Sequence, residues 1–293
     1  MEYEDIRARI SEVVDFEIEN VRPLGSGMGS TAYVVNDEWV FRFPQTKEAE
    51  LTLVKEAKVL PVLEPALPVG IPVFSYVQAT EDAPAFAGYE LLPGEAMTRE
   101  RFGGLDPGVQ EQLLGEMYGF LESLHAVAIG KVPELREEPL VGAYNAGQRQ
   151  FHERLKDVLT AEEVQKIEKI FQVYESDPAN RPEKPSVIHA DLKPDHVLFD
   201  EVRGHLSGVL DWGDSCLGDP DYDFAVIGVF FGDEFLQRLL GLAEKADRER
   251  IAGKVPFLVL VRALQDLVID VAAHDEALVT AGLRHLRKQL EKF

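Results

Sequence analysis

The sequence predicts an α+β fold made of two lobes, a small sheet-containing lobe followed by a larger helical lobe. Strand patterns occupy most of the chain up to about residue 92, and helical periodicity occupies most of the remainder. The chain has 293 residues, of which 45% are hydrophobic, so it can bury one large core or, more readily, two modest ones. We therefore expect an N-terminal lobe over residues 1–92 and a C-terminal lobe over residues 93–293.

The chain is strongly acidic, with 52 acidic and 30 basic residues and a formal net charge of −22 at pH 7. No run of lysine or arginine is present, so nucleic acid and anionic membrane surfaces are excluded as partners. A cationic small molecule would be attracted instead, although acidity can also serve solubility alone.

The sequence contains no recognisable secretion or membrane signal. Residues 1–16 are charged throughout and lack the apolar segment of a signal peptide. The apolar stretch at residues 256–273 is interrupted by three charged residues, so it does not resemble a membrane span. The single cysteine, Cys216, excludes an intramolecular disulfide and fits a reducing compartment. We expect a cytoplasmic monomer.

The N-terminal lobe is predicted to begin with an amphipathic helix over residues 3–14. Strand patterns follow over residues 16–24, 31–35, 39–43, 73–77 and 86–92. A glycine-rich turn joins the first two strands. Its residues include Gly25, Ser26, Gly27, Gly29 and Ser30. Because glycine has no Cβ atom, the backbone N–H groups of such a turn can approach a triphosphate closely.

The C-terminal lobe is predicted to be mainly helical. Pro93 and Gly94 end the last strand of the first lobe. Helical patterns follow over residues 107–127, 143–158, 160–175, 233–245, 248–274 and 275–293. Thr160 is expected to cap its helix, and His125 is expected to match the dipole at the end of the first of these helices.

Residues 186–224 contain most of the candidate chemistry. A short apolar run stops at His189, which predicts a buried strand, and Asp191 then lies in a polar loop. Residues 197–199 and 208–210 predict a hairpin.

Asp211 closes the second strand of this hairpin, so the segment offers one loop carboxylate, Asp191, and one strand-end carboxylate. Phosphoryl transfer uses two such groups, one to accept the proton of the attacking hydroxyl and one to hold Mg²⁺.

The same stretch contains two motifs with family character. His189 and Asp191 form an H-x-D motif, and His196 follows five residues later. Residues 211–213 are Asp-Trp-Gly, and residues 218–224 are GDPDYDF. Together these motifs resemble the aminoglycoside phosphotransferase family, small-molecule kinases of the protein-kinase-like fold, and a macrolide kinase branch is included in the resemblance.

This resemblance implies a nucleotide site in the N-terminal lobe. Arg42 would stand where protein kinases have lysine and would hold the phosphates of ATP or GTP. Its ion-pair partner is expected on helix 46–63, with Glu56 as the best candidate and Glu48 and Glu50 as alternatives.

The resemblance also implies roles in base recognition and catalysis. The backbone at Glu90 and Leu92 would bind the nucleotide base, which does not separate ATP from GTP. Asp191 would deprotonate the acceptor, and Asp211 would hold Mg²⁺. His196 stands where the family usually has Asn, and imidazole suits softer metals, so we expect it to act through water or a phosphate oxygen.

A cationic acceptor would be met by carboxylates. The candidates are Asp214, Asp233, Glu234, Asp266 and Asp270. Asp221 and Asp223 are expected to be solvated or capping residues. Asp219 is expected to cap a helix that starts at Pro220 and to brace the catalytic loop.

We therefore expect Mg²⁺-dependent transfer of a γ-phosphate to a hydroxyl of an aminoglycoside, conferring antibiotic resistance. A macrolide 2′-phosphotransferase is one alternative, which His196 favours and the acidity disfavours. Choline-like or amino-sugar acceptors are another, and a nucleotide-binding scaffold without catalysis is a third.

Overall fold

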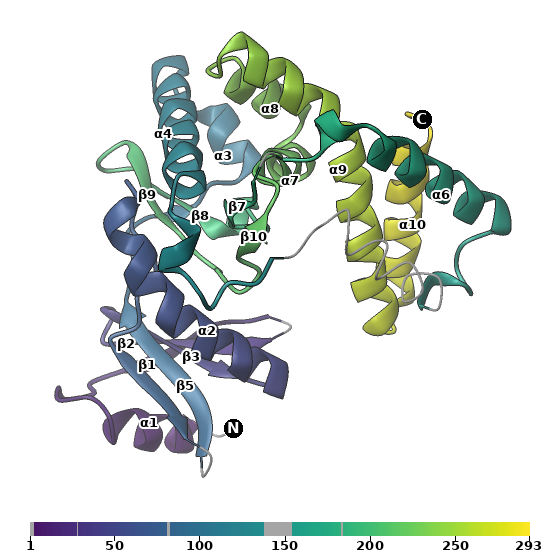
Figure 1. Ribbon diagram of the computed structural model, residues 1–293. Coiled ribbons are helices and arrows are strands. Elements are labelled where there is room, and N and C mark those ends of the chain that lie inside the picture. Colours follow the sequence, from purple (N-terminus) through teal and green to yellow (C-terminus); the bar gives the residue numbers. More distant parts are fainter. Residues whose placement is uncertain (1–2, 28, 81–82, 138–153, 183) are drawn as a thin grey trace. The chain divides into compact units, whose positions relative to one another are not determined.

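The computed structural model describes residues 3–27, 29–80, 83–137, 154–182 and 184–293. The chain divides into two compact units, each built from segments that are not contiguous in sequence (Figure 1). The first unit contains residues 1–97, 130–135 and 195–213. The second unit contains residues 98–129, 136–194 and 214–293.

A five-stranded antiparallel sheet forms the centre of the first unit, with the strand order β1-β2-β3-β5-β4. Its strands are β1 (Val21–Ser26), β2 (Ser30–Val35), β3 (Trp39–Pro44), β4 (Tyr76–Thr80) and β5 (Ala83–Glu90). The predicted strands are all present, although the first starts five residues later than expected and the fourth starts three residues later. The glycine-rich turn joins β1 to β2, as predicted.

Two helices pack on opposite faces of this sheet. Helix α1 (Tyr3–Ser11) buries Ile6 and Ile10 against Phe41 and Phe43, which point to one face of β3. Helix α2 (Lys47–Leu63) contacts β3 and β5 and lies on the Arg42 face, because side chains alternate along a strand.

Helix α2 begins where its sequence predicts. Thr46 is the N-cap residue, and its side chain accepts a hydrogen bond from the N–H of Ala49 at 3.1 Å. A short 3₁₀ helix, η1 (Glu64–Ala66), follows directly.

A three-stranded sheet of order β6-β8-β9 completes the first unit. It consists of β6 (Glu95–Ala96), β8 (Val197–Asp200) and β9 (His205–Val209). The β8–β9 hairpin confirms the prediction. Gly70 exchanges two backbone hydrogen bonds with this hairpin, and a Cβ atom at Gly70 would lie 2.9 Å from the carbonyl oxygen of Ser207. Glycine is therefore required at position 70, where the backbone runs beside β9.

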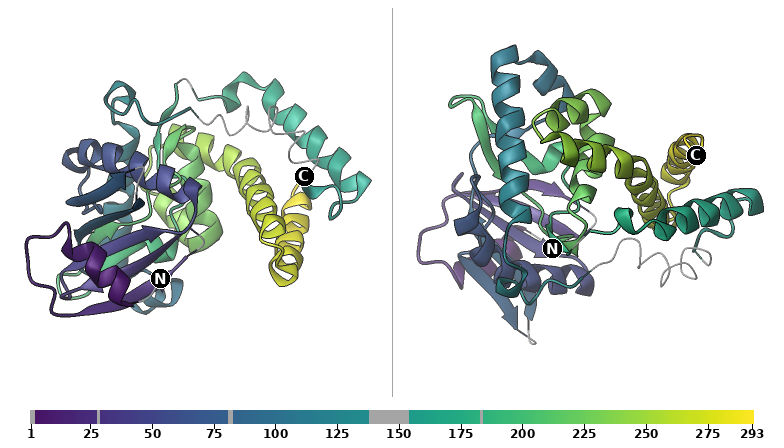
Figure 2. Two further views of the ribbon diagram at one scale, coloured as in Figure 1. Left: turned by 90° about the horizontal axis from the view of Figure 1, so that it is seen from below. Right: turned by 45° about the horizontal axis from the view of Figure 1, so that its top comes forward.

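Among its described residues, the second unit is helical apart from one two-stranded antiparallel sheet, formed by β7 (Ser186–Ile188) and β10 (Cys216–Gly218). Its helices are α3 (Arg99–Gly104), α4 (Pro107–His125), α6 (Ala161–Ser176), α7 (Asp221–Phe231), α8 (Asp233–Leu240), α9 (Lys245–Ala272) and α10 (Glu276–Leu290). The 3₁₀ helix η3 (Pro178–Asn180) also belongs to this unit. Two further 3₁₀ helices, η2 (Ile129–Lys131) and η4 (Pro194–His196), each contain a position where the chain passes from a segment of one unit to a segment of the other. Figure 2 shows α9 and α10 running side by side, and both contribute to one core together with α6 and α7.

The second unit differs from prediction in two places. Helix α7 begins at Asp221 instead of Pro220, although the Asp219 carboxylate still accepts the N–H of Asp221 at 3.0 Å. The helix expected over residues 143–158 lies mostly outside the described residues. Helix α6, in contrast, has the predicted N-cap at Thr160, with a reciprocal capping box to Glu163.

The two compact units do not follow a single cut in the sequence, because residues 195–213 belong to the first unit. The division at residue 92 into functional lobes stays a prediction.

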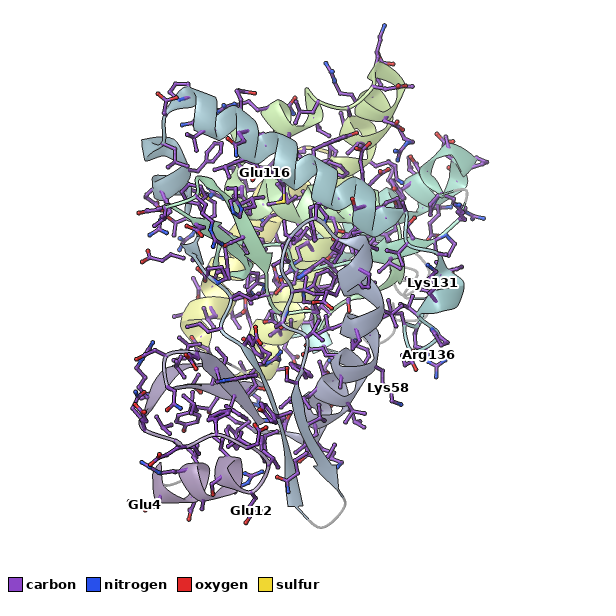
Figure 3. All side chains as sticks on the ribbon, turned by 90° about the vertical axis from the view of Figure 1, so that its left-hand side faces the viewer. Glu4, Glu12, Lys58, Glu116, Lys131 and Arg136 are labelled. Atoms are coloured by element: carbon purple, nitrogen blue, oxygen red, sulfur yellow. The ribbon has the colours of Figure 1, made fainter. Side chains whose placement is uncertain are left out.

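Among the described residues, no helix is long and apolar enough to span a membrane. Many charged side chains lie at the surface, including Glu4, Lys58 and Arg136, which Figure 3 labels.

Candidate active site

The first unit contains a buried ion pair between β3 and α2. The Arg42 Nη1 atom lies 2.7 Å from Glu56 Oε2, and the Glu56 side chain is fully buried. This is the partner that the sequence favours; Glu50 instead bonds Lys47 at 2.6 Å. Arginine was expected to face away from Phe41 and Phe43, and it does.

The surroundings of this ion pair shift both groups. Burial raises the pKa of Glu56, the charge of Arg42 opposes that rise, and the nearby charge of Asp211 adds to it. Burial alone would lower the pKa of Arg42, but Glu56 and Asp211 outweigh it, so the pKa of Arg42 is raised. Arg42, Glu56 and Asp211 therefore form one electrostatic cluster within the first unit.

Asp211 lies two residues after the end of β9 in a left-handed conformation, with φ of 60°. A residue with a side chain adopts this conformation at a cost of about 1–3 kcal/mol, so the surrounding structure must hold it there. The next residue supplies part of that support: Trp212 is fully buried, and its indole N–H donates to the carbonyl of Val209 at 2.9 Å. The Asp211 side chain itself remains 52% exposed.

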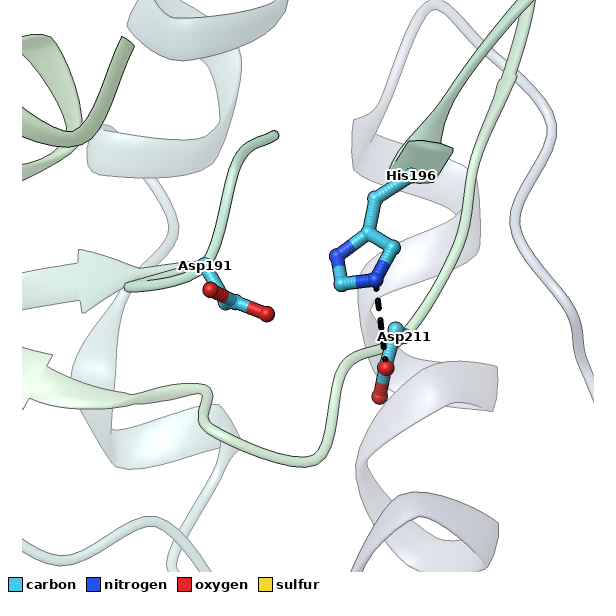
Figure 4. A group of neighbouring side chains, drawn as sticks. All are labelled: Asp191, His196 and Asp211. Carbon is cyan, nitrogen blue, oxygen red and sulfur yellow. Dashed lines mark ion pairs between the residues drawn. The ribbon is translucent and has the colours of Figure 1, made fainter. Parts of the chain in front are cut away.

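His196 precedes β8 and points at Asp211. Its Nε2 atom lies 3.3 Å from Asp211 Oδ2, the contact marked by a dashed line in Figure 4. The backbone joins the same two segments, because the N–H of Leu210 donates to the carbonyl of His196 at 2.8 Å. His196 is therefore placed to orient the carboxylate.

Gly213 allows helix α2 to approach Asp211 closely. A Cβ atom at Gly213 would lie 3.0 Å from the Thr52 methyl group and 3.4 Å from Glu56 Oε1. Lys55, which directly precedes Glu56 on α2, donates from Nζ to the Gly213 carbonyl at 2.6 Å. Lys55 was not singled out in the sequence, because a lysine on a helix has no distinctive pattern.

The residues of the first unit fit a bound Mg²⁺ at Asp211. A half-exposed carboxylate is a ligand that this cation prefers. The Glu56 Oε1 atom is buried and, among the described residues, has no hydrogen-bond partner, so negative charge near Asp211 is incompletely compensated. His196 fits a supporting role better than a direct one, because its ring nitrogen already contacts Asp211.

The predicted nucleotide-contact residues lie on turns and strand ends of the first unit. In the glycine-rich turn, the N–H of Gly27 donates to the carbonyl of Ser30 at 3.0 Å, and Cβ atoms at Gly25 and Gly27 would meet nothing within 4 Å. A Cβ atom at Gly29 would lie 3.5 Å from the Ala49 Cβ, and Ser26 lies within hydrogen-bond reach of Thr31 and Gln45.

The predicted hinge follows β5. Glu90 is exposed at the end of that strand, opposite Trp39 of β3. The Leu92 side chain packs near Gly70 and Gly208. Base recognition by the backbone at Glu90 and Leu92 stays a prediction.

In the second unit, Asp191 lies in the loop after β7. His189 is fully buried, as expected for a scaffold residue, and its Nδ1 accepts the N–H of Asp191 at 3.3 Å. Between them, Ala190 has a left-handed backbone, with φ of 67°. The loop is therefore strained and buried.

Asp223 braces this loop. Its carboxylate accepts the N–H of His189 at 3.2 Å and the N–H of Ala190 at 2.8 Å. It also contacts His125 Nε2 at 2.9 Å, so His125 does more than match a helix dipole. The expectation that Asp223 is solvated was wrong, because its side chain is fully buried.

Asp219 is held by a different partner. Lys254 on α9 pairs with both Asp219 and Asp221, the latter at 2.8 Å, and Arg250 also pairs with Asp221. Burial raises the pKa of Asp219, while Lys254 opposes the rise. The bracing role predicted for Asp219 belongs to Asp223, and Asp221 is buried instead of solvated.

Asp191 is contacted by two cations. Lys193 Nζ lies 2.9 Å from Oδ2, and Arg262 Nη2 lies 2.8 Å from Oδ1. Arg262 also bonds Asp266 at 2.8 Å, so this predicted acceptor residue is already paired. Burial raises the pKa of Asp266, and Arg262 opposes the rise.

The other predicted acceptor residues occupy separate places in the second unit. Asp214 and Glu234 are exposed. Burial raises the pKa of Asp270, one turn beyond Asp266 on α9. Asp233 lines a cavity of about 430 Å³ whose other charged or titratable lining residues are Arg99, His285, Lys288 and Lys292.

A five-stranded antiparallel sheet with an Arg–Glu pair, and a helical unit containing an H-x-D loop, define a phosphotransferase of the protein-kinase-like fold. The chain belongs to the phosphotransferase enzyme family, whose model matches residues 20–253. This confirms the fold class, the family resemblance and the enzyme class expected from the sequence.

Solved structures agree with this fold over nearly the whole chain. The GDP and kanamycin complex of APH(2″)-IIia has a TM-score of 0.87 and 24% identity, covering 99% of each chain. Macrolide 2′-phosphotransferase type I has a TM-score of 0.73 and 20% identity, covering 98% of each chain.

Viomycin phosphotransferase from Streptomyces vinaceus is 40% identical over 84 residues. That match covers 27% of this chain and 29% of the relative, so the shared region is less than a third of either protein.

Proposed function

We propose that this protein transfers the γ-phosphate of ATP or GTP to a hydroxyl group of an aminoglycoside, with Mg²⁺, and thereby confers antibiotic resistance. The observation that carries the proposal is the loop at Asp191, where a buried carboxylate follows H-x in the order typical of the family and where Asp223 of α7 and Arg262 of α9 hold the loop. A scaffold without catalysis would have no need of such a loop.

In the proposed reaction, the first unit binds the nucleotide. Arg42, kept charged by Glu56, attracts the phosphates, and the open glycine-rich turn leaves room for them. Asp211, oriented by His196, holds Mg²⁺, which neutralises phosphate charge when it is bound.

Asp191 orients the acceptor hydroxyl and accepts its proton. Its two oxygens contact Lys193 and Arg262 at 2.9 and 2.8 Å. Removal of a positioned general base typically costs about 10²–10⁴ in rate.

The acceptor is proposed to be cationic because the chain has a net charge of −22 and because an APH(2″) relative was solved with kanamycin. The residues proposed to meet its amines are Asp214, Asp233, Glu234 and Asp270. Asp266 contributes less, since Arg262 neutralises it.

A second candidate, phosphorylation of a macrolide hydroxyl, is favoured by one observation. One of the carboxylates expected to attract amines, Asp266, is paired with Arg262, and the charged residues that line the cavity beside Asp233 are the cations Arg99, Lys288 and Lys292. An acceptor with fewer positive charges suits these surroundings.

The test is a phosphorylation assay with the purified protein. Kanamycin, gentamicin and a macrolide are each incubated with Mg²⁺ and either ATP or GTP, and the phosphorylated product is detected by mass spectrometry. Product from kanamycin or gentamicin supports the first candidate, and product from the macrolide alone supports the second. Nucleotide binding without any product would favour the scaffold.

Asp191→Asn is the matched control for this assay. We expect a loss of at least ~2.7 kcal/mol of transition-state stabilisation, about 10²-fold in turnover. Turnover equal to that of the unmodified protein would remove Asp191 from the mechanism.

A further inference from the structure

Arg262 on α9 directs its guanidinium group at three oxygen atoms. Nε donates to Asp266 Oδ1 at 2.8 Å, Nη1 to the carbonyl of Ala190 at 3.1 Å, and Nη2 to Asp191 Oδ1 at 2.8 Å. The side chain is 12% exposed. An arginine with this set of contacts has little freedom to change rotamer.

Asp266 and Phe230 fix the plane of the Arg262 guanidinium group, independently of its contact with Asp191. Asp266 lies one helical turn further along α9 and accepts from Nε, and the Phe230 ring lies 5.2 Å from the guanidinium carbon. Burial alone would lower the pKa of Arg262, but Asp266, Tyr222 and Asp191 raise it, so the group stays charged.

The loop at Asp191 is therefore held from two sides. Asp223 accepts the N–H groups of His189 and Ala190, and Arg262 donates to the carbonyl of Ala190. The left-handed residue Ala190 thus has both its N–H and its carbonyl bonded to buried charged groups. Arg262, unlike Asp223, also contacts the neighbouring Asp191 carboxylate, so it couples the backbone of the loop to its reactive side chain.

The two oxygens of Asp191 have unequal partners. Oδ1 contacts Arg262, which is almost buried, whereas Oδ2 contacts Lys193, whose side chain is 32% exposed. The long flexible lysine side chain can leave Oδ2 at lower cost than the clamped arginine can leave Oδ1. Oδ2 is therefore the oxygen that an acceptor hydroxyl can reach.

We propose that Arg262 is a positioning residue for Asp191, which holds Oδ1 and the Ala190 carbonyl so that Oδ2 is presented to the acceptor hydroxyl. This inference rests on the proposed function in one respect, the assignment of Asp191 as the base. It adds a residue from α9, seventy-one positions away in sequence, to the reaction.

The first test compares Arg262→Lys and Arg262→Gln with the unmodified protein in the phosphorylation assay. Lysine retains the charge but cannot bond Asp191, Ala190 and Asp266 together, so we expect an intermediate loss. For Arg262→Gln we expect kcat to fall by about 10²-fold, the loss typical of a reactive group displaced by about 1 Å. The KM for the nucleotide should stay within twofold, because Arg262 bonds Asp266, Ala190 and Asp191, none of which is proposed to bind the nucleotide.

Arg287→Gln is the control variant. Arg287 on α10 also forms an ion pair, at 2.7 Å to Glu163, but neither residue is near the Asp191 loop in the contacts that the structure describes. It should leave kcat unchanged. An equal fall in kcat for both variants would show a general effect of lost ion pairs and would overturn the proposal.

Chemical rescue separates positioning from folding. In Arg262→Ala, added methylguanidinium should restore part of kcat, because it can occupy the vacated space and contact the same oxygens, whereas methylammonium should restore much less. Absence of any difference between the two cations would contradict a geometric role. If Arg262→Ala does not fold, Asp266→Asn serves instead, since it removes only the bond that orients Nε, and a smaller fall in kcat is expected.

A double-mutant cycle distinguishes failure of this inference from failure of the proposed function. The melting temperatures of Asp191→Asn, Arg262→Gln and the double variant are compared in the absence of any acceptor. Non-additive shifts support the Asp191–Arg262 pair even if no acceptor is phosphorylated. Additive shifts would overturn the pair, and with it the inference. Full activity of Asp191→Asn would overturn the base assignment itself.

Discussion

Asp223 stabilises the backbone of the Asp191 loop, a role that its position at the start of a helix does not indicate. It lies in the first turn of α7, where acidic residues usually face solvent and favour the helix dipole. Here its carboxylate is buried and bonds two successive backbone N–H groups and a histidine from α4. One side chain thus links β7, α4 and α7.

Replacement of Asp223 should destabilise the protein. Asp223→Ala leaves the N–H groups of His189 and Ala190 buried without an acceptor, and each such group costs about 1–3 kcal/mol. We expect the free energy of unfolding, measured in urea, to fall by about 2–6 kcal/mol. Asp157→Ala, at an exposed position of the same unit, is the control and should change it little. A loss below about 1 kcal/mol for Asp223→Ala would show that water replaces the carboxylate.

His196 should matter through Asp211. Since its ring contacts the Asp211 carboxylate at 3.3 Å, His196→Ala removes an orienting partner and leaves the proposed ligand in place. Loss of such a partner typically weakens metal affinity by about 10–100-fold. We expect the Mg²⁺ concentration for half-maximal activity to rise by about this factor, with activity recovered at saturating Mg²⁺. An unchanged Mg²⁺ requirement would reduce His196 to a packing residue.

At the scale of elements, β3 and α2 form the pair on which the first unit's charged site is built. Alternation along β3 sends Phe41 and Phe43 into the core under α1 and sends Arg42 toward α2. Strand β5 then places Tyr89 within electrostatic range of this pair. A tyrosine hydroxyl in such a buried, charged setting resists ionisation.

The pH dependence of stability should reveal this tyrosine. Burial, reinforced by Glu56 and Asp211 and opposed by Arg42, raises the pKa of Tyr89 to about 12 from an ordinary value of 10.0. The unfolded chain therefore loses this proton at lower pH than the folded chain does. The stabilisation from Tyr89 is complete below pH 10 and is lost as the pH rises from about 10 to about 12.

Tyr89→Phe isolates the effect. This change in pKa corresponds to a loss of about 3 kcal/mol of stability. The unmodified protein should lose up to this amount relative to Tyr89→Phe when urea unfolding is compared at pH 8.5 and pH 11.5. Parallel pH profiles for the two proteins would mean that Tyr89 ionises freely.

At the scale of the whole molecule, the charge of −22 makes association with a cationic acceptor sensitive to salt. Charges are screened beyond about 30 Å at 0.01 M ionic strength but beyond about 8 Å at 0.15 M. We expect kcat/KM for kanamycin to fall by about tenfold or more between 10 and 300 mM NaCl. An uncharged acceptor measured under the same conditions is the control. A flat profile for kanamycin would indicate that the acidity serves solubility alone.

Local patterns predicted much of this molecule. Thr160 caps its helix as expected, helix α2 begins within one residue of its predicted start, the β8–β9 hairpin follows its turn signals, and Arg42 bonds the expected partner fourteen residues away. These features depend on residues within one or two neighbouring elements, so they can be predicted from the local sequence.

Partners that are distant in sequence could not be predicted in the same way. Asp223, Lys254 and Arg262 each pair with a residue on another element, and a charged residue in a helix gives no sign of which one. The assignment of the loop brace to Asp219 failed for this reason. Asp219 and Asp223 both lie near the acidic start of α7, and the packing of α9 against α7 pairs Lys254 with Asp219.

Cys216 gives the chain a practical advantage for spectroscopy. It is the single cysteine in 293 residues, and its side chain is buried in β10. Thiol-reactive dyes should therefore spare it and label cysteines introduced at exposed positions such as Lys58 and Glu100, one on each unit. Fluorescence energy transfer between two such dyes would then follow the separation of the units during turnover, without removal of the native thiol.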